Sequence, residues 1–515
     1  MRHFPKHFLI AVVLCSVLAC DSTDVGDDPA SQPPLITTES LLLNPTGYVP
    51  LAAELKLETR VPVQVEIEVA GRTSDSEPLI HRFEEIATSF TLPILGLYPE
   101  HTNTLHIRFY DNRNQLMGEE SRSIDTQKLL PELPGINVSV NTGRQKPGMN
   151  LVSYFGHTNS QLPQIPFIFD EEGYIRWYAN MVTHPVLGKL FYDAGVERLR
   201  SGNLYFGDGS SGRIVEMDML GNVINEWPIP GYWFHHNVLE LPNGNLLATV
   251  SKNDLPTIED HIIEIHRVSG NIVQVWDLRE SLDQRRRILS SNPRDWIHSN
   301  GLTYDEATDA IIVSGRVQGT IKLSRNNEVI WILGQHRGWD QSGDGTDLKS
   351  KLLQPLDASG TPITDPQVLQ GFVDHPEFSW PWYQHAPKLT PQGTLFVFDN
   401  GDNRHYQGQP VFSRAVEYRI DDQAMTIQQV WEYGRERGFS TYSGIVSDVD
   451  YHDDEQSVVF MPGANFQFGP NGKTVEVDYN TKEVLYEAEV RKEAPASGIT
   501  FHRIERLPIY PSNNQ

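Results

Sequence analysis

Short runs that alternate between apolar and polar residues fill the first part of the chain. Between Leu35 and Asp125 such runs include Ala53–Glu58, Val63–Val69 and Leu105–Phe109, with polar turns between them. Alternation of this kind places every second side chain on one face, as in a half-buried antiparallel strand. We therefore predict a small N-terminal β-sandwich domain over residues 35–130, with no cluster of reactive side chains.

A longer repeat begins after a joint rich in proline and glycine, Leu130–Gly148. Each copy is a strand, a tight turn and a second strand. The copies are Phe167–Trp177, Gly212–Trp227, His261–Trp276, Thr320–Trp331, Ala415–Trp431 and, without the final tryptophan, Thr474–Leu485. The first four tryptophans recur about 50 residues apart, which is close to the length of a four-stranded propeller blade. The repeat predicts an all-β fold, a six-bladed β-propeller over residues 148–515.

Two further features belong to this prediction. The interval between Trp331 and Trp431 is about twice the usual one and holds an insertion, Gln335–Trp380, with few strand signals. The last apolar run, Ile499–Ile504, is expected to pair with the first blade, because closing the ring removes two free sheet edges. A stacked sandwich or a β-helix is the alternative architecture, but these repeats are too long for a β-helix.

The N-terminus has the pattern of an export signal. A basic start is followed by an apolar run, Phe8–Leu18, that is too short to cross a bilayer as an ordinary helix. It ends in Val-Leu-Ala-Cys20, which resembles a bacterial lipobox. We predict a lipoprotein signal peptide over 1–19, lipidation of Cys20, a flexible tether over 20–34 and a periplasm-facing, membrane-anchored lipoprotein of a Gram-negative bacterium. A plain secretory signal or an N-terminal membrane anchor is the alternative.

Cysteine usage and charge exclude several classes of function. The chain has 2 cysteines, Cys15 inside the predicted signal and Cys20 at its end, so the mature protein has no thiol for a disulfide, a zinc site or a nucleophile. The formal net charge of −25 argues against a general nucleic-acid binder, which needs a basic surface. An anionic substrate would require local positive charge.

Histidines stand at similar positions in three of the predicted blades. The sequence His235-His236-Asn237 precedes one strand pair, His298-Ser299-Asn300 precedes the next, and His385 precedes a third, after Trp382 and Tyr383. Loops at one end of the blades converge on the propeller axis, so these histidines are expected to share one site. A lone histidine is more often a surface or core residue, but the repeat itself brings these together.

An arginine follows the strand that His298 opens. A guanidinium directed toward the axis at Arg316 would bind a tetrahedral oxyanion through its fork of donors. A salt bridge within the blade is the alternative for this residue.

Several spaced motifs resemble one known family. The motifs HHN…ELPNGN, DWIHSN, SGRVQGTIKL…VIWILG…GW and WYQHAPKL…GTLFVFDNGDNR are similar to those of the bacterial aryl sulfotransferases that use no adenosine phosphosulfate donor. The resemblance covers nearly all of the predicted mature chain. It implies a six-bladed propeller with a small N-terminal β domain, and a two-step transfer of a sulfuryl group between phenols without metal or nucleotide.

The resemblance also implies roles for individual residues. By motif, His385 corresponds to the histidine that is transiently sulfated and His298 to a general acid/base. Asn300 corresponds to its neighbour and Arg316 to the sulfate-binding arginine. The remaining histidine falls on His235 by the HxN pattern or on His236 by the PNG turn, and the choice stays open. The disulfide found in some family members is absent here, since no cysteines remain in the mature chain.

Two acidic stretches have the spacing of oxygen ligands. The run from Asp340 through Ser342 and Asp344 to Gly345 has the oxygens and the glycine of a calcium loop, but its twelfth position is Lys351 instead of the expected glutamate. Calcium here is a minor alternative to the expectation of no cofactor and no metal. The Asp399–Asp402 run is interpreted as a tight blade turn in preference to a ligand set.

The expected function is therefore sulfuryl transfer from a phenolic sulfate ester to a phenolic acceptor. The expected partners are small phenols and aryl sulfates, a membrane reached through a lipid anchor, and a second copy in a homodimer, with no nucleic acid. The alternatives are a metal-dependent propeller hydrolase and a non-enzymatic propeller that serves as a binding scaffold.

Overall fold

The computed structural model describes residues 35–154, 165–181, 183–185, 187–188, 195–209, 211–408, 412–465, 471–491 and 500–511. The predicted signal peptide, the lipidation site Cys20 and the tether over 20–34 lie outside the described residues, as does Ile499 of the predicted closing strand. Strands dominate the described part of the chain, and the all-β prediction is confirmed.

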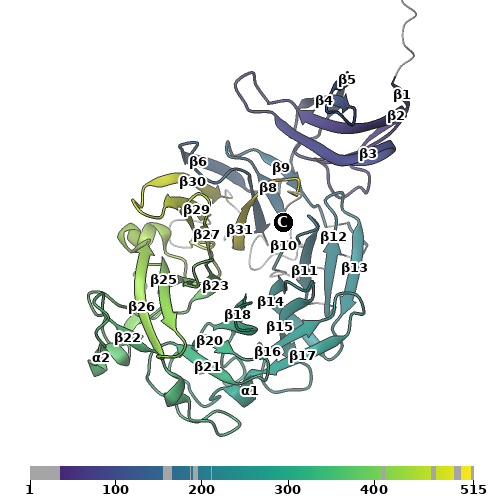
Figure 1. Ribbon diagram of the computed structural model, residues 1–515. Coiled ribbons are helices and arrows are strands. Elements are labelled where there is room, and N and C mark those ends of the chain that lie inside the picture. The colour runs from purple at the N-terminus through teal and green to yellow at the C-terminus, as the bar shows by residue number, and fades with distance from the viewer. Residues whose placement is uncertain are drawn as a thin grey trace, which may run out of the picture.

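The N-terminal domain is a twisted five-stranded sheet, seen at the upper right of Figure 1. Its strands are β1 (Ile36–Leu43), β2 (Ala53–Val69), β3 (Leu79–Ile94), β4 (Thr102–Tyr110) and β5 (Leu116–Asp125). The strands share one hydrogen-bonded network because β2 is long: β1 pairs with its first half and β4 with its second. The buried positions of β2 keep one parity along its length, so both halves face one core, which also contains propeller residues.

Within the described ranges, six further sheets are arranged around a central axis (Figure 1). From the innermost strand outward they are β31 (Phe501–Leu507), β7 (Met149–Tyr154), β8 (Phe167–Phe169) and β9 (Ile175–Tyr178); β10 (Glu197–Arg198), β11 (Leu204–Asp208), β12 (Arg213–Met217) and β13 (Val223–Pro228); β14 (Tyr232–Glu240), β15 (Leu246–Lys252), β16 (His261–Ile265) and β17 (Ile272–Asp277); β18 (Ser299–Asp305), β19 (Ala310–Gly315), β20 (Gly319–Leu323) and β21 (Val329–Leu333); β23 (His385–Leu389), β24 (Leu395–Asp399), β25 (Arg414–Asp421) and β26 (Thr426–Tyr433); and β27 (Asp448–His452), β28 (Ser457–Met461), β29 (Asn471–Asp478) and β30 (Val484–Arg491). We call these sheets blades one to six.

The repeated tryptophans connect neighbouring blades. Each lies near the end of the outermost strand of its blade and donates its indole N–H to the outer hairpin turn of the next blade. The bonds run from Trp177 to the Met219 carbonyl, Trp227 to Arg267, Trp276 to Ser324, Trp331 to the Asp422 carboxylate and Trp431 to Tyr479, at 2.7–2.8 Å. A buried indole needs such an acceptor, which explains why the repeat ends in tryptophan.

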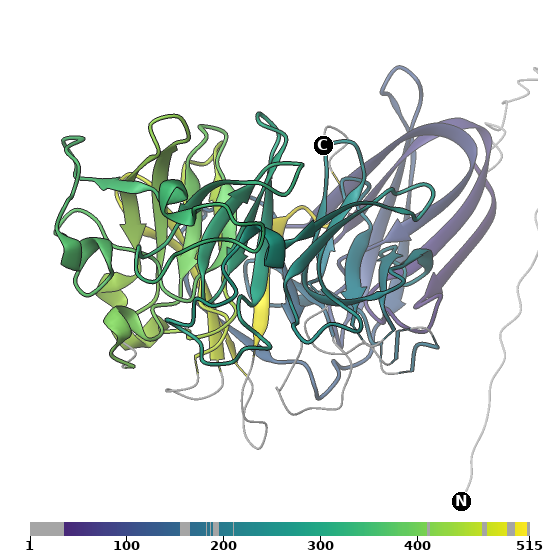
Figure 2. The same cartoon turned by 90° about the horizontal axis from the view of Figure 1, so that it is seen from below.

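Strands from both ends of the propeller segment close the ring. The C-terminal strand β31 pairs with β7 and takes the innermost place of blade one, so the predicted closure is confirmed over the described residues. A strand from the joint, β6 (Gly135–Asn141), pairs with β30 at the outer edge of blade six. Figure 2 shows β31 as the yellow strand near the centre of the propeller.

The long insertion adds to the outside of blade five. Its strand β22 (Gln354–Leu356) runs parallel to the outermost strand β26. The insertion also contains the short helices η1 (Leu348–Lys351) and α2 (Pro366–Leu369), and the other short helices are α1 (Leu278–Ser281), η2 (Arg404–Tyr406) and η3 (Arg435–Thr441).

Candidate active site

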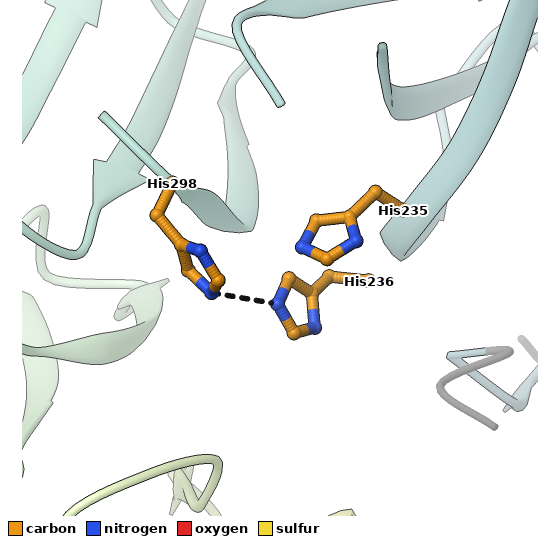
Figure 3. A group of neighbouring side chains, drawn as sticks. All are labelled: His235, His236 and His298. Atoms are coloured by element: carbon orange, nitrogen blue, oxygen red, sulfur yellow. Dashed lines mark hydrogen bonds between the residues drawn. The ribbon is translucent and has the colours of Figure 1, made fainter. Parts of the chain in front are cut away.

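The predicted histidines lie on the innermost strands of three consecutive blades. His235 and His236 belong to β14, His298 immediately precedes β18, and His385 is the first residue of β23. The ring centres of His235 and His236 lie 5.3 and 5.2 Å from that of His298 (Figure 3). The ring centre of His385 lies 6.4 Å from that of His236. The fold therefore brings together the histidines that the repeat placed at blade entrances.

Backbone irregularities turn these side chains toward one another. His236 and His298 have positive φ angles of 61° and 54°, and Ala386, next to His385, has 50°. The pairing of each inner strand with its neighbour shifts register at the same place. Non-glycine residues with positive φ at strand irregularities are costly and gather where a side chain must be aimed.

His298 lies against two carboxylates. Its Nδ1 is 2.7 Å from Glu259 Oε2 and 2.9 Å from Asp295 Oδ2. Burial alone would lower the pKa of His298, but the hydrogen bonds and charges of Asp295 and Glu259 outweigh it and raise the pKa to about 9. Burial would likewise raise the pKa of Glu259, yet His235 and His298 hold that pKa well below its usual value. The ring of His298 is therefore a cation at neutral pH and can donate a proton.

His385 has the opposite surroundings. It is 3% exposed, and its Nδ1 lies 2.7 Å from Asn400 Oδ1. The amide nitrogen of Asn400 donates to the carbonyls of Ser443 and Val446 at 2.8 and 3.0 Å, so its oxygen must face the histidine. Nδ1 of His385 therefore carries the proton, and Nε2 keeps its lone pair. Burial first, then the charge of Arg316, holds the pKa of His385 well below its usual value of 6.5.

Arg316 lies between these histidines and blade six. Its guanidinium stacks over the ring of Tyr383 at 4.9 Å, donates to the Gly444 carbonyl at 3.2 Å and reaches Asp402 only at 3.9 Å. Among the described residues its buried Nε has no hydrogen-bond partner. Because a buried donor without a partner is costly, Nε is suited to bind an oxyanion.

The remaining predicted residues have different surroundings. Asn300 donates to the Gln384 carbonyl at 3.0 Å, which ties blade four to the segment before His385, and its buried Oδ1 has no partner among the described residues. Of the histidine pair, His236 faces His385 and is 7% exposed. His235 faces away to Glu259 at 3.0 Å. Both lie in the cluster, and His236 is the one directed toward His385.

Four contributors were missed from the sequence: Glu259, Asp295, Asn400 and His502. His502 lies in β31, and its Nε2 is 3.2 Å from His236 Nδ1. Asp295 is within the DWIHSN motif, three residues before His298, and Asn400 lies in the stretch interpreted as a blade turn. His502 is the second residue of an inner strand, and His298 and His385 also stand at the start of inner strands, so the repeat pattern could have found it. Glu259 carries no such signal.

The turn after β24 is structural, as expected, apart from Asn400. Asp399 accepts hydrogen bonds from Arg404 and Arg414 at 2.7 and 2.8 Å and from the Trp382 amide at 2.8 Å. Its oxygens are thereby engaged within the protein. This network anchors the segment that contains His385 and Asn400.

Two groups in the described part of the chain have ligand atoms close enough for a metal ion, namely His235 with His236 and His298, and Glu259 with Asp295 and His298. Both share His298, whose Nε2 already bonds to His236 Nε2 at 3.2 Å. In the loop considered for calcium, Asp340 faces Arg285 and Lys349 at 3.5 and 3.3 Å, and Asp344 accepts from Ser342. Calcium at this loop stays a prediction.

Comparisons with known proteins show the family of the chain. The arylsulfotransferase (ASST) family model matches residues 136–500, and the arylsulfotransferase Ig-like domain model matches residues 40–127. The chain belongs to the arylsulfotransferase family. Arylsulfate sulfotransferase AssT of Escherichia coli O6:H1 strain CFT073 is 30% identical over 95% of this chain and 96% of its own length. AssT of Lelliottia amnigena is 29% identical over 88% and 90%.

Membership of the arylsulfotransferase family makes the chain an aryl sulfotransferase enzyme. It therefore favours the predicted sulfotransferase over the alternative of a non-enzymatic binding scaffold. Among solved structures, virginiamycin B lyase from Staphylococcus aureus has 10% identity and a TM-score of 0.33, covering 86% of this chain and 100% of that one. A similarity this low adds nothing to the argument. In the described ranges, no helix has the length and apolar character needed to span a membrane.

Proposed function

We propose that this arylsulfotransferase-family enzyme transfers sulfuryl groups by a ping-pong route through a sulfohistidine at His385. The observation that supports it is the pairing of two opposite histidines across one cluster. His385 is neutral with a free Nε2, and His298 is a cation held by two carboxylates. One ring is suited to be a nucleophile and the other a proton donor.

In the first step, Nε2 of His385 attacks sulfur of an aryl sulfate as the bond from sulfur to the phenolic oxygen breaks. Arg316 and His236 are neighbours of His385 and would hold the sulfuryl oxygens. Asn300, by its resemblance to the family motif, is assigned to substrate binding with them. The leaving phenolate takes the proton from Nε2 of His298.

In the second step, the sulfuryl group passes from His385 to the acceptor phenol. The phenol gives its proton to Nε2 of His298, and its oxygen attacks sulfur as the bond from sulfur to His385 Nε2 breaks. The enzyme returns to its starting protonation state, so the cycle needs no nucleotide donor, metal or other cofactor. Arg316 supplies positive charge beside His385 in a chain whose formal net charge is −25.

Intact-mass analysis after a short exposure to 4-nitrophenyl sulfate, with no acceptor, tests this route. We expect release of one equivalent of 4-nitrophenol together with a sulfuryl adduct that maps to His385. Steady turnover without any adduct, or an adduct at another residue, would contradict the assignment.

A metal-dependent hydrolase is the second candidate, because the three clustered histidines have the spacing that a metal ion could use. It requires release of inorganic sulfate to water and activity that depends on added metal. The transferase instead requires an acceptor phenol, so the two are separated by the product formed.

The proposal includes an exported enzyme tethered through lipid on Cys20 and facing the periplasm of a Gram-negative bacterium. The proposed partners of the enzyme are small phenols and aryl sulfates, and no nucleic acid. The homodimer stays a prediction. Fractionation of cells expressing the chain and its Cys20→Ser variant tests the anchor. We expect the wild type with the membranes and the variant in the soluble fraction.

A further inference from the structure

His502 connects the C-terminal strand to the active-site cluster. It lies in β31, the innermost strand of blade one, and is 5% exposed. Its ring centre is 4.6 Å from that of His236, and the Nε2 atom is 3.2 Å from His236 Nδ1. The ring reaches the cluster only because β31 closes the propeller.

The contact adds His502 to a hydrogen-bonded series of histidines. His236 bonds to His502 through Nδ1 and to His298 through Nε2, both at 3.2 Å. His298 in turn holds the carboxylates of Glu259 and Asp295 through its Nδ1. We call His502, His236 and His298 the histidine chain.

Each contact between two ring nitrogens needs one N–H and one lone pair. When His298 is a cation, its Nε2–H donates to His236 Nε2, so His236 must carry its proton on Nδ1 and donate to Nε2 of His502. When His298 is neutral, the carboxylates keep the proton on its Nδ1. Its Nε2 must then accept from His236, and His236 Nδ1 must accept from His502.

The two protonation states of His298 therefore require opposite directions of both bonds. Nε2 of His502 must therefore accept a hydrogen bond in one protonation state of His298 and donate one in the other. An imidazole Nε2 can do both, whereas an apolar side chain can do neither.

We propose that His502 is a positioning residue for proton transfer in the sulfuryl-transfer reaction, acting through the tautomer of His236. The inference rests on the proposed function. As the sulfur–oxygen bond of the donor breaks and His385 Nε2 bonds to sulfur, the Nε2 proton of His298 passes to the phenolate oxygen. His236 and His502 then each shift their ring proton from Nδ1 to Nε2, which leaves three ring protons in the histidine chain. The protons that remain satisfy both contacts only in the reversed direction, and the acceptor phenol restores the original direction with its own proton.

Donors of graded leaving-group acidity test this role. For His502→Leu, we expect phenol release in the first step to slow by about 10²-fold with phenyl sulfate, whose leaving group needs a proton. With 4-nitrophenyl sulfate, which leaves as a stable anion, the loss should be below about threefold. His502→Gln places an amide near the position of Nε2 that accepts or donates by rotation, so it should recover most of the rate with phenyl sulfate.

His452→Leu is the matched control. His452 is a buried histidine of blade six that contacts Ser457 and Glu476 and is not part of the histidine chain. We expect any rate change in this variant to be the same for both donors. Thermal unfolding of each variant separates loss of folded protein from loss of rate.

Equal slowing of both donors in His502→Leu, or no recovery in a folded His502→Gln, would overturn the inference. If His502→Leu does not fold, the comparison of donors in His502→Gln and His502→Asn decides, since asparagine is too short to place its amide near Nε2. Failure of the proposed function is distinct, because the wild type would then form no adduct at His385.

Discussion

The entrances of blades four and five place a histidine in equivalent positions and give it opposite properties. His298 meets two carboxylates, which raise its pKa to about 9. Burial and the charge of Arg316 keep the pKa of His385 well below 6.5, although its hydrogen bond to the neutral amide of Asn400 acts in the opposite direction. The propeller repeat determines where a histidine lies. The loops that connect the strands, which do not repeat, determine the charge of that histidine, and with it the difference between an acid and a nucleophile.

The largest effect should come from exchanging the two histidines for alanine. We expect His385→Ala to lose at least about 10⁴-fold in turnover with every donor, because the route through a covalent intermediate is gone. His298→Ala should lose about 10²- to 10³-fold with phenyl sulfate and much less with 4-nitrophenyl sulfate. Steady-state assays with both donors measure this. Similar donor dependence in the two variants would remove the distinction between acid and nucleophile.

Next in size is the removal of the amide that orients His385. Asn400→Leu frees the tautomer of His385 and leaves the carbonyls of Ser443 and Val446 without their donor, so we expect turnover to fall by about 10²-fold and stability by about 2 kcal/mol. Asn400→Asp keeps an acceptor for Nδ1–H and should retain more activity at pH 8. Turnover and thermal unfolding measure the two effects, and equal loss in both variants would assign Asn400 to packing alone.

A smaller effect is expected from the carboxylates around His298. A general acid acts while protonated, so kcat/KM for phenyl sulfate should be maintained below pH about 9 and fall as the pH rises through that value. Glu259→Gln removes one of the charges that raise the pKa of His298, so the fall in kcat/KM should move to a lower pH. Glu264→Gln, which removes a carboxylate of blade three that pairs with Arg325, is the control and should leave the profile in place. An unmoved profile in Glu259→Gln would contradict the assigned cause.

The smallest effect is expected from metal removal. His236 and His298 bond to each other, and His298 contacts Glu259, so dialysis against EDTA or 1,10-phenanthroline should leave transfer to a phenol unchanged. Loss of activity that zinc or another divalent ion restores would favour the hydrolase alternative at His235, His236 and His298.

Periodic features of the sequence predicted most of the fold. The tryptophan at the end of each copy identified the blades, and the structure shows that its indole bonds to the turn of the next blade. Histidines at blade entrances predicted a shared site for the same reason, since a repeat places equivalent residues at equivalent distances from the axis. The choice between His235 and His236 needed the backbone, because a positive φ at His236 turns only one of the pair toward His385.

By itself, the sequence determined the all-β repeat and the residues whose chemistry suits sulfuryl transfer, because both depend on local patterns. Only the tertiary structure decided the protonation of the site. Asn400 lies 15 residues from His385, and His502 lies 266 residues from His236. Glu259 lies 40 residues before Ser299, the residue that follows His298. Circular closure brings these segments to one axis, and burial there makes each contact strong enough to set a charge or a tautomer.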